Sequence, residues 1–289
     1  MTCNSLRRLT IALAVTAAAA SVAFAAEPLG QRPSFMTRAL TELPNAQAIV
    51  AQIWAPGLDD GYVPQGLTIQ GDTLVMGAYR STDTAQDRGP CRVFFIDRKS
   101  GAVKETLDLP SSCGHAGGAA ALADGRLVIA DTRIIFIIDQ KRSIRSVRLG
   151  GALRGSFADA DAGHLWLGVY GRSPGSLWRV PLEALKKDVI DESDVNLTIP
   201  VAARAQGLVI DGKGGGWVTV SGSEDGALLR IDAATGQLLA RYDMPPGIED
   251  LAIDERGLIW AVSESGSQRW SKWRSNHPIL FAIDPSKLK

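Results

Sequence analysis

Several side chains that can move protons or bind a metal stand beside short apolar runs in this sequence. Glu249 and Asp250 are adjacent, Glu264 follows the next apolar run, and His115 precedes an earlier one. Carboxyl and imidazole groups are common proton donors and acceptors in general acid–base catalysis. We therefore expect His115, Glu249 and Glu264 to be catalytic residues. If the protein binds a divalent ion such as Ca²⁺ or Zn²⁺, we expect Glu249 and Asp250 to be its ligands.

A wider set of amide, aromatic and charged side chains borders other apolar runs or lies in a long polar loop near the C-terminus. Convergent groups of this kind line pockets for small polar ligands. The expected ligand-binding residues are Gln65, Tyr79, Arg80, Asp131, Arg154, Tyr170, Gln206 and Trp270. The alternative is that these side chains line a polar channel and hydrogen-bond only to one another and to water.

The apolar runs belong to a repeated unit, which predicts the elements that position these residues. Each unit has a short strand, a Gly/Asp turn, a stronger strand, a loop and a third strand that usually ends in Asp. The first strands of the units are expected at 66–69, 118–121, 155–158, 207–210 and 250–253. Their spacing is typical of β-propeller blades. The sequence therefore predicts an all-β propeller of five four-stranded blades.

Two segments bear on the blade count and on closure of the ring. Residues 48–57 resemble residues 238–247, and each segment stands just before a first strand. We therefore expect residues 48–55 to supply the outer strand that the last blade lacks, because closure removes an exposed sheet edge. Six blades is the alternative, if residues 181–204 contain a degenerate unit. Residues 182–195 are better explained as a short helical insertion.

The repeat also predicts which face carries the site. The hairpin turns are short, whereas the loops after the second strands are long, at 81–90, 171–175, 222–226 and 264–278. In a four-stranded blade these long loops emerge on the same face as the segments that enter the first strands. Functional residues concentrate on long loops held by a rigid scaffold. We therefore expect the candidate residues to converge at the mouth of the central channel.

The N-terminus predicts export. Arg7 and Arg8 precede an apolar run that ends in a small-x-small cleavage site at residues 23–25. We assign residues 1–25 to a signal peptide, 26–47 to a lead-in segment and 48–289 to a single propeller domain, located in the periplasm or secreted. Cleavage would leave Cys91 and Cys113, which we expect to form a disulfide in an oxidising compartment.

Charge and hydropathy narrow the range of partners. Removal of the signal would leave 29 basic and 31 acidic side chains, a net charge of −2, which gives no basic excess for nucleic acid. The mature chain has no second apolar stretch long enough to span a membrane. We expect a monomer whose partner is a small molecule.

Three short phrases carry a resemblance to a known group of proteins. The segments at 63–67, 114–118 and 264–267, together with the repeated strand–Asp–turn–Gly units, resemble secreted propellers related to gluconolactonases and strictosidine-synthase-like proteins. The resemblance implies a divalent metal at the channel mouth, held by a Glu of an early blade and by Asn and Asp of other blades. Here Gln65 follows Pro64, and Asn is missing from the expected mouth residues.

These observations lead to an ordered set of functional hypotheses. The first is an exported propeller that binds a small organic ligand or glycan at the channel mouth. The second is a metal-assisted hydrolase of lactone, ester or glycoside bonds, and the third is a scaffold that binds other proteins through its rim.

Overall fold

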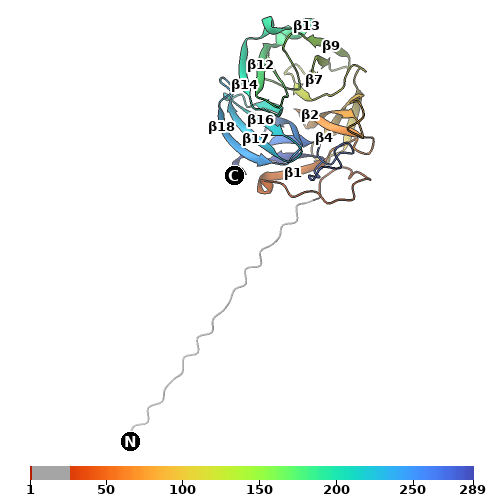
Figure 1. Ribbon diagram of the computed structural model, residues 1–289, viewed down its shortest axis with the longest axis vertical. Helices are drawn as coiled ribbons and strands as arrows, with labels where there is room; N and C mark the ends of the chain where they lie inside the picture. The colour runs from red at the N-terminus through yellow and green to blue at the C-terminus, as the bar shows by residue number, and fades with distance from the viewer. Residues whose placement is uncertain (2–26) are drawn as a thin grey trace.

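The computed structural model describes Met1 and residues 27–289, which form a ring of β-sheets (Figure 1). The expected signal peptide lies outside the described residues, apart from Met1, and remains a prediction. Helices in the described residues are short 3-10 turns. Among these residues, none forms a helix of the length and hydropathy that crossing a membrane requires.

Five sheets radiate from the centre of the ring, and the expected five-bladed propeller is confirmed. Blade 1 comprises β2 (Tyr62–Gln70), β3 (Thr73–Arg80), β4 (Cys91–Asp97) and β5 (Val103–Asp108). Blade 2 comprises β6 (Gly118–Ala121), β7 (Leu127–Asp131), β8 (Ile134–Ile138) and β9 (Ile144–Leu149). Blade 3 comprises β10 (Phe157–Ala160), β11 (His164–Gly168), β12 (Gly175–Pro181) and β14 (Leu197–Val201). Blade 4 comprises β15 (Ala205–Ile210), β16 (Gly215–Ser221), β17 (Gly226–Asp232) and β18 (Leu238–Met244).

Blade 5 joins the two ends of the described chain, as expected. Its inner strands are β19 (Ile248–Ile253), β20 (Ile259–Ser263) and β21 (Ile279–Ile283), and its outer strand is β1 (Ile49–Trp54). Strand β1 pairs antiparallel with β21, from Trp54 opposite Ile279 to Ile49 opposite Ile283. The N-terminal strand therefore covers the edge that β21 would otherwise expose.

The insertion in blade 3 does not form a sixth blade. It contains two 3-10 helices, η2 (Leu182–Lys186) and η3 (Glu192–Asp194), and a two-residue strand, β13 (Val189–Ile190). Strand β13 pairs in parallel with β9 and extends blade 2. The helical expectation for 182–195 is thus met by 3-10 turns, and the chain then returns to blade 3 as β14.

Glycine in the innermost strands of three blades permits the close approach of neighbouring blades. A Cβ atom at Gly66 would lie 2.8 Å from the backbone of Gly118, and one at Gly118 would lie 2.2 Å from the backbone of Ala158. A Cβ atom at Gly207 would lie 2.5 Å from the Cα of Asp250. Contacts this short are not tolerated in packed interiors, so these positions require glycine.

Asp250 occupies the equivalent position in blade 5, and its carboxylate links the inner strands of four blades. The side chain is fully buried. Its Oδ2 accepts hydrogen bonds from the backbone N–H groups of Leu67 and Ala119, both at 3.0 Å, and its Oδ1 accepts a longer one from Leu208 at 3.4 Å. Each donor directly follows one of the three glycines. We call this group the hub carboxylate.

Replacement of Asp250 tests the hub carboxylate. Asp250→Ala would leave the N–H groups of Leu67, Ala119 and Leu208 without an acceptor, and each unsatisfied buried donor costs about 1–3 kcal/mol. We expect the free energy of unfolding, measured by urea denaturation, to fall by about 3 kcal/mol or more. Asp250→Asn keeps one carbonyl oxygen and should lose less.

The exposed Asp243 on β18 provides a control. Asp243→Asn should change the free energy of unfolding by no more than about 0.5 kcal/mol. A folded Asp250→Ala protein that loses less than about 1 kcal/mol would contradict the role of the hub carboxylate.

Candidate functional site

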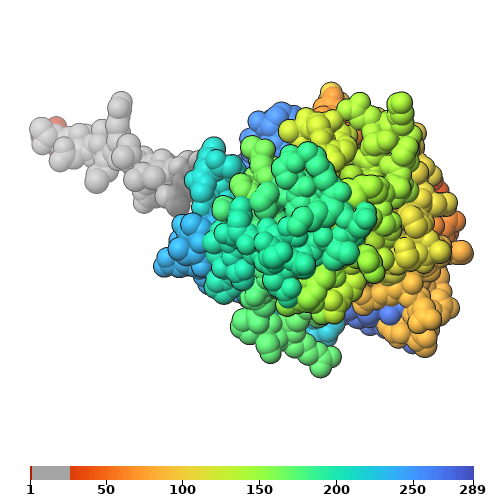
Figure 2. All heavy atoms as spheres, turned by 90° about the horizontal axis from the view of Figure 1, so that it is seen from above, coloured from red at the N-terminus to blue at the C-terminus, as the bar shows by residue number. Residues whose placement is uncertain are grey.

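A pocket of about 560 Å³ lies at one mouth of the central channel, and every blade contributes to it. We call it the mouth pocket. Strands β2, β15 and β19 place Gln65, Gln206 and Glu249 there, and the segment before β6 places His115. Blade 3 contributes Ser156 and Tyr170. The volume is within the range of small-molecule sites. Figure 2 shows the domain edge-on, with green segments of blade 3 projecting beyond the disc on its lower side.

Irregular strand pairing aims three of these side chains into the mouth pocket. The register of β2 shifts between Pro64 and Leu67, where Gln65 lies. Equivalent shifts occur between Ala205 and Gly207, around Gln206, and between Ile248 and Leu251, around Glu249. A β-bulge bends the strand and turns a side chain away from the regular alternation. The pocket thus depends on one backbone irregularity that recurs in blades 1, 4 and 5.

Glu249 and Glu264 form a buried carboxyl pair within the mouth pocket. Only 2% of Glu249 and 7% of Glu264 is exposed. Glu249 Oε1 accepts a hydrogen bond from Gln206 Nε2 at 2.9 Å. Glu264 Oε2 accepts two, from Gln65 Nε2 at 2.9 Å and from Trp270 Nε1 at 2.6 Å. Two N–H donors favour the ionised form of Glu264 over that of Glu249.

The surroundings raise the affinity of this pair for protons. Burial raises the pKa of Glu249 well above its usual range, and the neighbouring charge of Glu264 raises it further. Burial raises the pKa of Glu264 to about 7, opposed by the hydrogen bond from Trp270 and the nearby charge of Arg88. A hydrogen bond between the carboxyl groups raises the pKa of Glu249 and lowers that of Glu264. These shifts make Glu249 the better proton donor of the pair and Glu264 the better proton acceptor.

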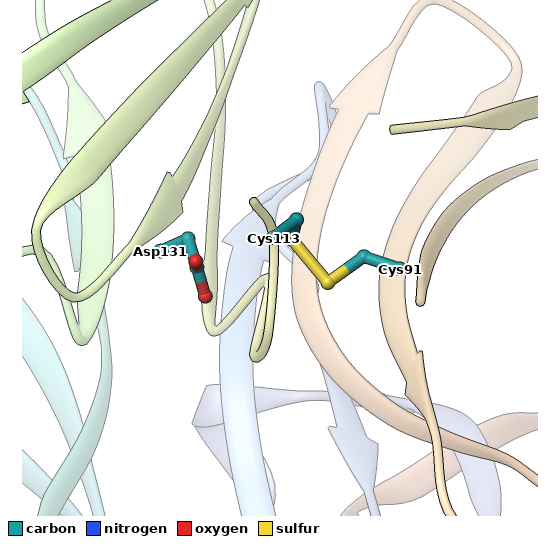
Figure 3. Close-up of side chains that lie close together, drawn as sticks. All are labelled: Cys91, Cys113 and Asp131. Atoms are coloured by element: carbon teal, nitrogen blue, oxygen red, sulfur yellow. A yellow bond between two sulfur atoms is a disulfide. The ribbon is translucent and has the colours of Figure 1, made fainter. Parts of the chain in front are cut away.

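The loop that carries His115 is fixed on two sides (Figure 3). The expected disulfide between Cys91 and Cys113 is present, with a Cα–Cα distance of 5.7 Å, and joins the loop to β4. On the other side, the Asp131 carboxylate at the end of β7 accepts hydrogen bonds from the backbone N–H groups of Gly114 and Ala116, both at 3.1 Å. These contacts hold His115 at the pocket wall.

His115 is a neutral group in this position. Burial, reinforced by the charge of Arg88, lowers the pKa of His115 to about 3. A base of this strength is poorly matched to proton abstraction near neutral pH. Glu264, whose pKa burial raises to about 7, is therefore better matched to this role than His115.

Aromatic rings form much of the remaining wall. Tyr79, Tyr170, Trp270 and Trp273 line the mouth pocket, and the two indole rings stack with centroids 4.7 Å apart. Burial raises the pKa of Tyr79, which keeps its hydroxyl protonated. The guanidinium of Arg88 lies 5.2 Å from the centroid of the Tyr79 ring and faces the same pocket.

Other expected site residues lie elsewhere. Arg80 is exposed, and its Nε donates to the carbonyl oxygen of Asp60. Arg154 donates to the carbonyl oxygens of Gly151 and Leu153. The carboxylates of Asp131 and Asp250 accept backbone N–H groups and are absent from the pocket lining.

The structure also adds residues that the pattern of strands did not single out. These are Arg88, Thr132, Ser156, Ser223 and Trp273. The long loops at 81–90 and 264–278 supply Arg88 and Trp273, so loop length was the available signal. An alignment of strands cannot predict where a side chain in an irregular loop lies.

The donor set at the mouth does not fit the divalent metal site implied by the resemblance. The carboxyl groups at the mouth are those of Glu249 and Glu264, whereas a hard cation requires several oxygen ligands, mostly anionic. Among the described residues, the one cluster of three potential ligand side chains is Cys91, Cys113 and Asp131, and its two sulfurs are joined in the disulfide.

Comparisons with known proteins establish the fold. No family model and no curated protein matches the chain. The glutaminyl cyclase of Myxococcus xanthus matches with a TM-score of 0.57 and 15% identity over 81% of this chain and 94% of that one. A luciferin-regenerating enzyme matches with a TM-score of 0.49 and 11% identity over 78% of this chain and 92% of that one. A glucose dehydrogenase matches with a TM-score of 0.44 and 9% identity, over 81% of this chain and 82% of that one.

At these identities the similarity shows a β-propeller fold alone. Membership of the gluconolactonase-related group therefore stays a prediction.

The raised pKa of Glu264 predicts how stability depends on pH. The folded protein holds this proton up to about pH 7, whereas an ordinary Glu releases it near 4.5. The stabilising contribution of Glu264 to the free energy of unfolding is therefore complete below the ordinary pKa of 4.5 and is lost as pH rises through 7. His115 and His277, whose pKa values are lowered to about 3 by burial, oppose this trend only up to the ordinary value of 6.5.

Glu264→Gln removes the titrating group without changing its shape. Its free energy of unfolding should fall less than that of the wild type between about pH 5 and about pH 8. The exposed Glu224→Gln serves as a control and should follow the wild type. Parallel curves for the wild type and Glu264→Gln would show that Glu264 has an ordinary pKa.

Proposed function

We propose that this protein is a metal-independent acid–base enzyme. In this proposal the mouth pocket binds a small substrate that carries an amine and an amide, and closes it into a ring with release of ammonia. The buried Glu249–Glu264 pair is the observation that carries the proposal. It offers one protonated and one ionisable carboxyl group, joined by a hydrogen bond, at the base of an aromatic pocket.

Ring closure by an amine onto an amide needs both of these groups. An ammonium group must first release one proton to the solvent to become a neutral amine. The amine nitrogen must then lose a second proton as it bonds to the amide carbon, and the amide nitrogen must gain a proton as it leaves. Glu264 is suited to accept the proton that the amine loses during bond formation because its ionisation is centred near pH 7. Glu249 is suited to donate a proton to the leaving amide nitrogen because its raised pKa keeps it protonated.

The step balances without a cofactor. The new carbon–nitrogen bond forms while the old one breaks, and ammonia leaves with the proton from Glu249. Glu264 then holds the proton taken from the amine. Their mutual hydrogen bond provides a direct path by which this proton returns to Glu249, so the pair recovers its starting state.

The walls of the mouth pocket are suited to such a substrate. Aromatic faces attract an approaching ammonium group, and carboxylates attract it further. The guanidinium of Arg88 can bind carbonyl or carboxylate oxygens of the same molecule. Neutral His115 and protonated Tyr79 supply uncharged hydrogen-bonding groups at the wall.

The name of the similar Myxococcus protein, a glutaminyl cyclase, suggests a candidate substrate. Cyclisation of a glutaminyl group joins an amine to the side-chain amide of the same residue, which is the reaction type that the carboxyl pair supports. We therefore propose peptides with N-terminal glutamine as the first substrates to test. Export to the periplasm or beyond, as the N-terminus predicts, would place the enzyme among extracytoplasmic peptides.

Two of the functional hypotheses drawn from the sequence differ in how well they agree with this proposal. Binding of a small organic molecule at the mouth is part of it. Metal-assisted hydrolysis has less support, because Asp250 is hydrogen-bonded to backbone groups of three blades and the mouth pocket is left with two carboxyl groups, those of Glu249 and Glu264.

Mass spectrometry of a glutaminyl tripeptide amide incubated with the protein tests the proposal directly. We expect loss of one ammonia per peptide, unchanged by EDTA, with a pH optimum near neutrality. Glu249→Gln and Glu264→Gln should each lower kcat about 10²- to 10⁴-fold, the usual contribution of general acid–base groups.

Glu224→Gln, an exposed change in a loop after β16, serves as the matched control and should retain full activity. Binding of the peptide without turnover would contradict the enzyme and favour a binding protein. Activity that EDTA abolishes would contradict metal independence. Activity unaffected by either pair substitution would remove the pair from the mechanism.

A further inference from the structure

The loop at 264–278 forms one wall of the mouth pocket and connects β20 to β21. It carries the stacked pair Trp270 and Trp273, and Trp270 donates its indole N–H to Glu264. Its backbone folds through successive turns, from Ser267 N–H to the Glu264 carbonyl and from Trp273 N–H to the Trp270 carbonyl. Such a loop has few strand hydrogen bonds to define its position, so other contacts must fix it.

Arg38, in the lead-in segment before β1, makes such contacts. Its Nη1 donates to the carbonyl oxygens of Ser271 at 3.1 Å and Trp273 at 3.0 Å. Its Nη2 donates to the carbonyl oxygen of Arg274 at 2.7 Å. These partners are backbone carbonyls within four consecutive residues. One planar guanidinium therefore fixes the backbone of the segment that presents the two indole rings.

A second set of contacts keeps the lead-in segment against the same loop. The side chain of Asn276 is buried and donates to the carbonyl oxygens of Arg38 at 3.3 Å and Ala39 at 2.8 Å. Thr41 and Asn276 exchange two further bonds: Asn276 N–H donates to Thr41 Oγ1, and Thr41 N–H donates to the Asn276 carbonyl. The backbone of Arg38 is therefore held in place independently of its guanidinium.

The opposite side of the loop is fixed by Arg269. Its guanidinium donates to the hydroxyl of Ser81 and to the carbonyl oxygens of Asp83 and Gln86, in the loop that carries Arg88. Arg269 thus joins two pocket loops, whereas Arg38 joins the pocket to the lead-in segment. Trp270 lies between these two attachments, and Trp273 is one of the residues that Arg38 contacts.

We propose that Arg38 is a positioning residue for the mouth pocket: it holds the loop at 271–274 so that Trp270 donates its indole N–H to Glu264. The effect of Arg38 on catalysis rests on the proposed function, whereas its effect on the position of the loop does not. Loss of the Arg38 contacts would leave the fold in place and loosen the indole pair. Glu264 would then lose one of its two N–H donors and hold its proton to higher pH.

Limited trypsin digestion tests the positioning role without reference to activity. The loop contains Arg269, Lys272 and Arg274 as cleavage sites. Arg38→Met keeps an apolar stem and removes three hydrogen bonds, so cleavage within 269–274 should accelerate about tenfold or more. Arg32→Met, in the same lead-in segment, removes a 3.8 Å ion pair with Glu27 and a guanidinium that lies 5.8 Å from the centroid of the Trp54 ring. Neither contact involves the loop at 264–278, so cleavage there should be unchanged.

A pH measurement tests the connection to Glu264. The free energy of unfolding falls as pH rises through the pKa of Glu264. In Arg38→Met this fall should occur at higher pH than in the wild type. Trp270→Phe, which removes the indole N–H that donates to Glu264, should show the same shift. Glu264 also faces Glu249, Tyr79 and Arg88, whose contacts with it both variants keep. If glutaminyl peptides are substrates, kcat should fall in both variants, and its dependence on pH should shift in the same direction.

The outcomes separate this role from the proposed function. Faster cleavage and a shifted stability profile in a protein that turns over no glutaminyl peptide would support the role of Arg38 and contradict the proposed reaction. Wild-type cleavage and an unshifted profile in Arg38→Met would overturn the role of Arg38, whatever the activity. If Arg38→Met does not fold, Arg38→Lys, which keeps the charge and loses the planar fork, should show an intermediate increase in cleavage.

Discussion

The hub carboxylate of Asp250 is the interaction on which the geometry of this propeller depends. It accepts backbone N–H groups from Leu67, Ala119 and Leu208, so it connects the inner strand of blade 5 to those of blades 1, 2 and 4. Inner strands can approach this closely only where side chains are missing, which explains the glycines that precede all three donors. One carboxylate then satisfies donors that the crowded centre would otherwise leave unpaired.

The hub carboxylate and the mouth pocket share one stretch of backbone. Glu249 and Asp250 are adjacent within the irregular start of β19, and the irregularity directs Asp250 to the other blades and Glu249 to the mouth. The equivalent irregularities around Gln65 and Gln206 direct two amides to the same place, where each donates to one carboxyl group of the pair. The centre of the fold and the site are therefore positioned by the same residues.

Two similar side chains acquire different roles from their neighbours. Both Glu249 and Glu264 are buried, which favours protonation. Glu264 accepts hydrogen bonds from Gln65 and Trp270, whereas Glu249 accepts one from Gln206, so Glu264 ionises first. The additional donor at Glu264 favours its ionisation over that of Glu249.

Sequence reasoning recovered the fold because strand periodicity and turn residues repeat locally. The likeness of residues 48–57 to 238–247 was sufficient to predict that β1 closes blade 5. The same alignment placed five residues before the first strands: Gln65, His115, Arg154, Gln206 and Glu249. All of them except Arg154 line the pocket. The alignment could not show which way each side chain points.

Asp250 illustrates the limit. Its neighbour Glu249 suggested a pair of metal ligands, but the side chain turns to backbone groups of residues far away in the sequence. The partnership of Glu249 with Glu264, and that of Arg38 with the loop at 271–274, likewise depends on loop paths that carry no periodic signal.

Nuclear magnetic resonance of protein labelled with ¹³C at the glutamate carboxyl carbons tests the central claim most directly. Glu249→Gln and Glu264→Gln would assign the two resonances. The carboxyl pair predicts that Glu264 titrates near pH 7 and that Glu249 keeps its proton to higher pH. It also predicts that removal of either carboxyl group changes the titration of the other. Independent titration of both groups near the ordinary value of 4.5 would contradict a shared proton and, with it, the acid–base role of the mouth pocket.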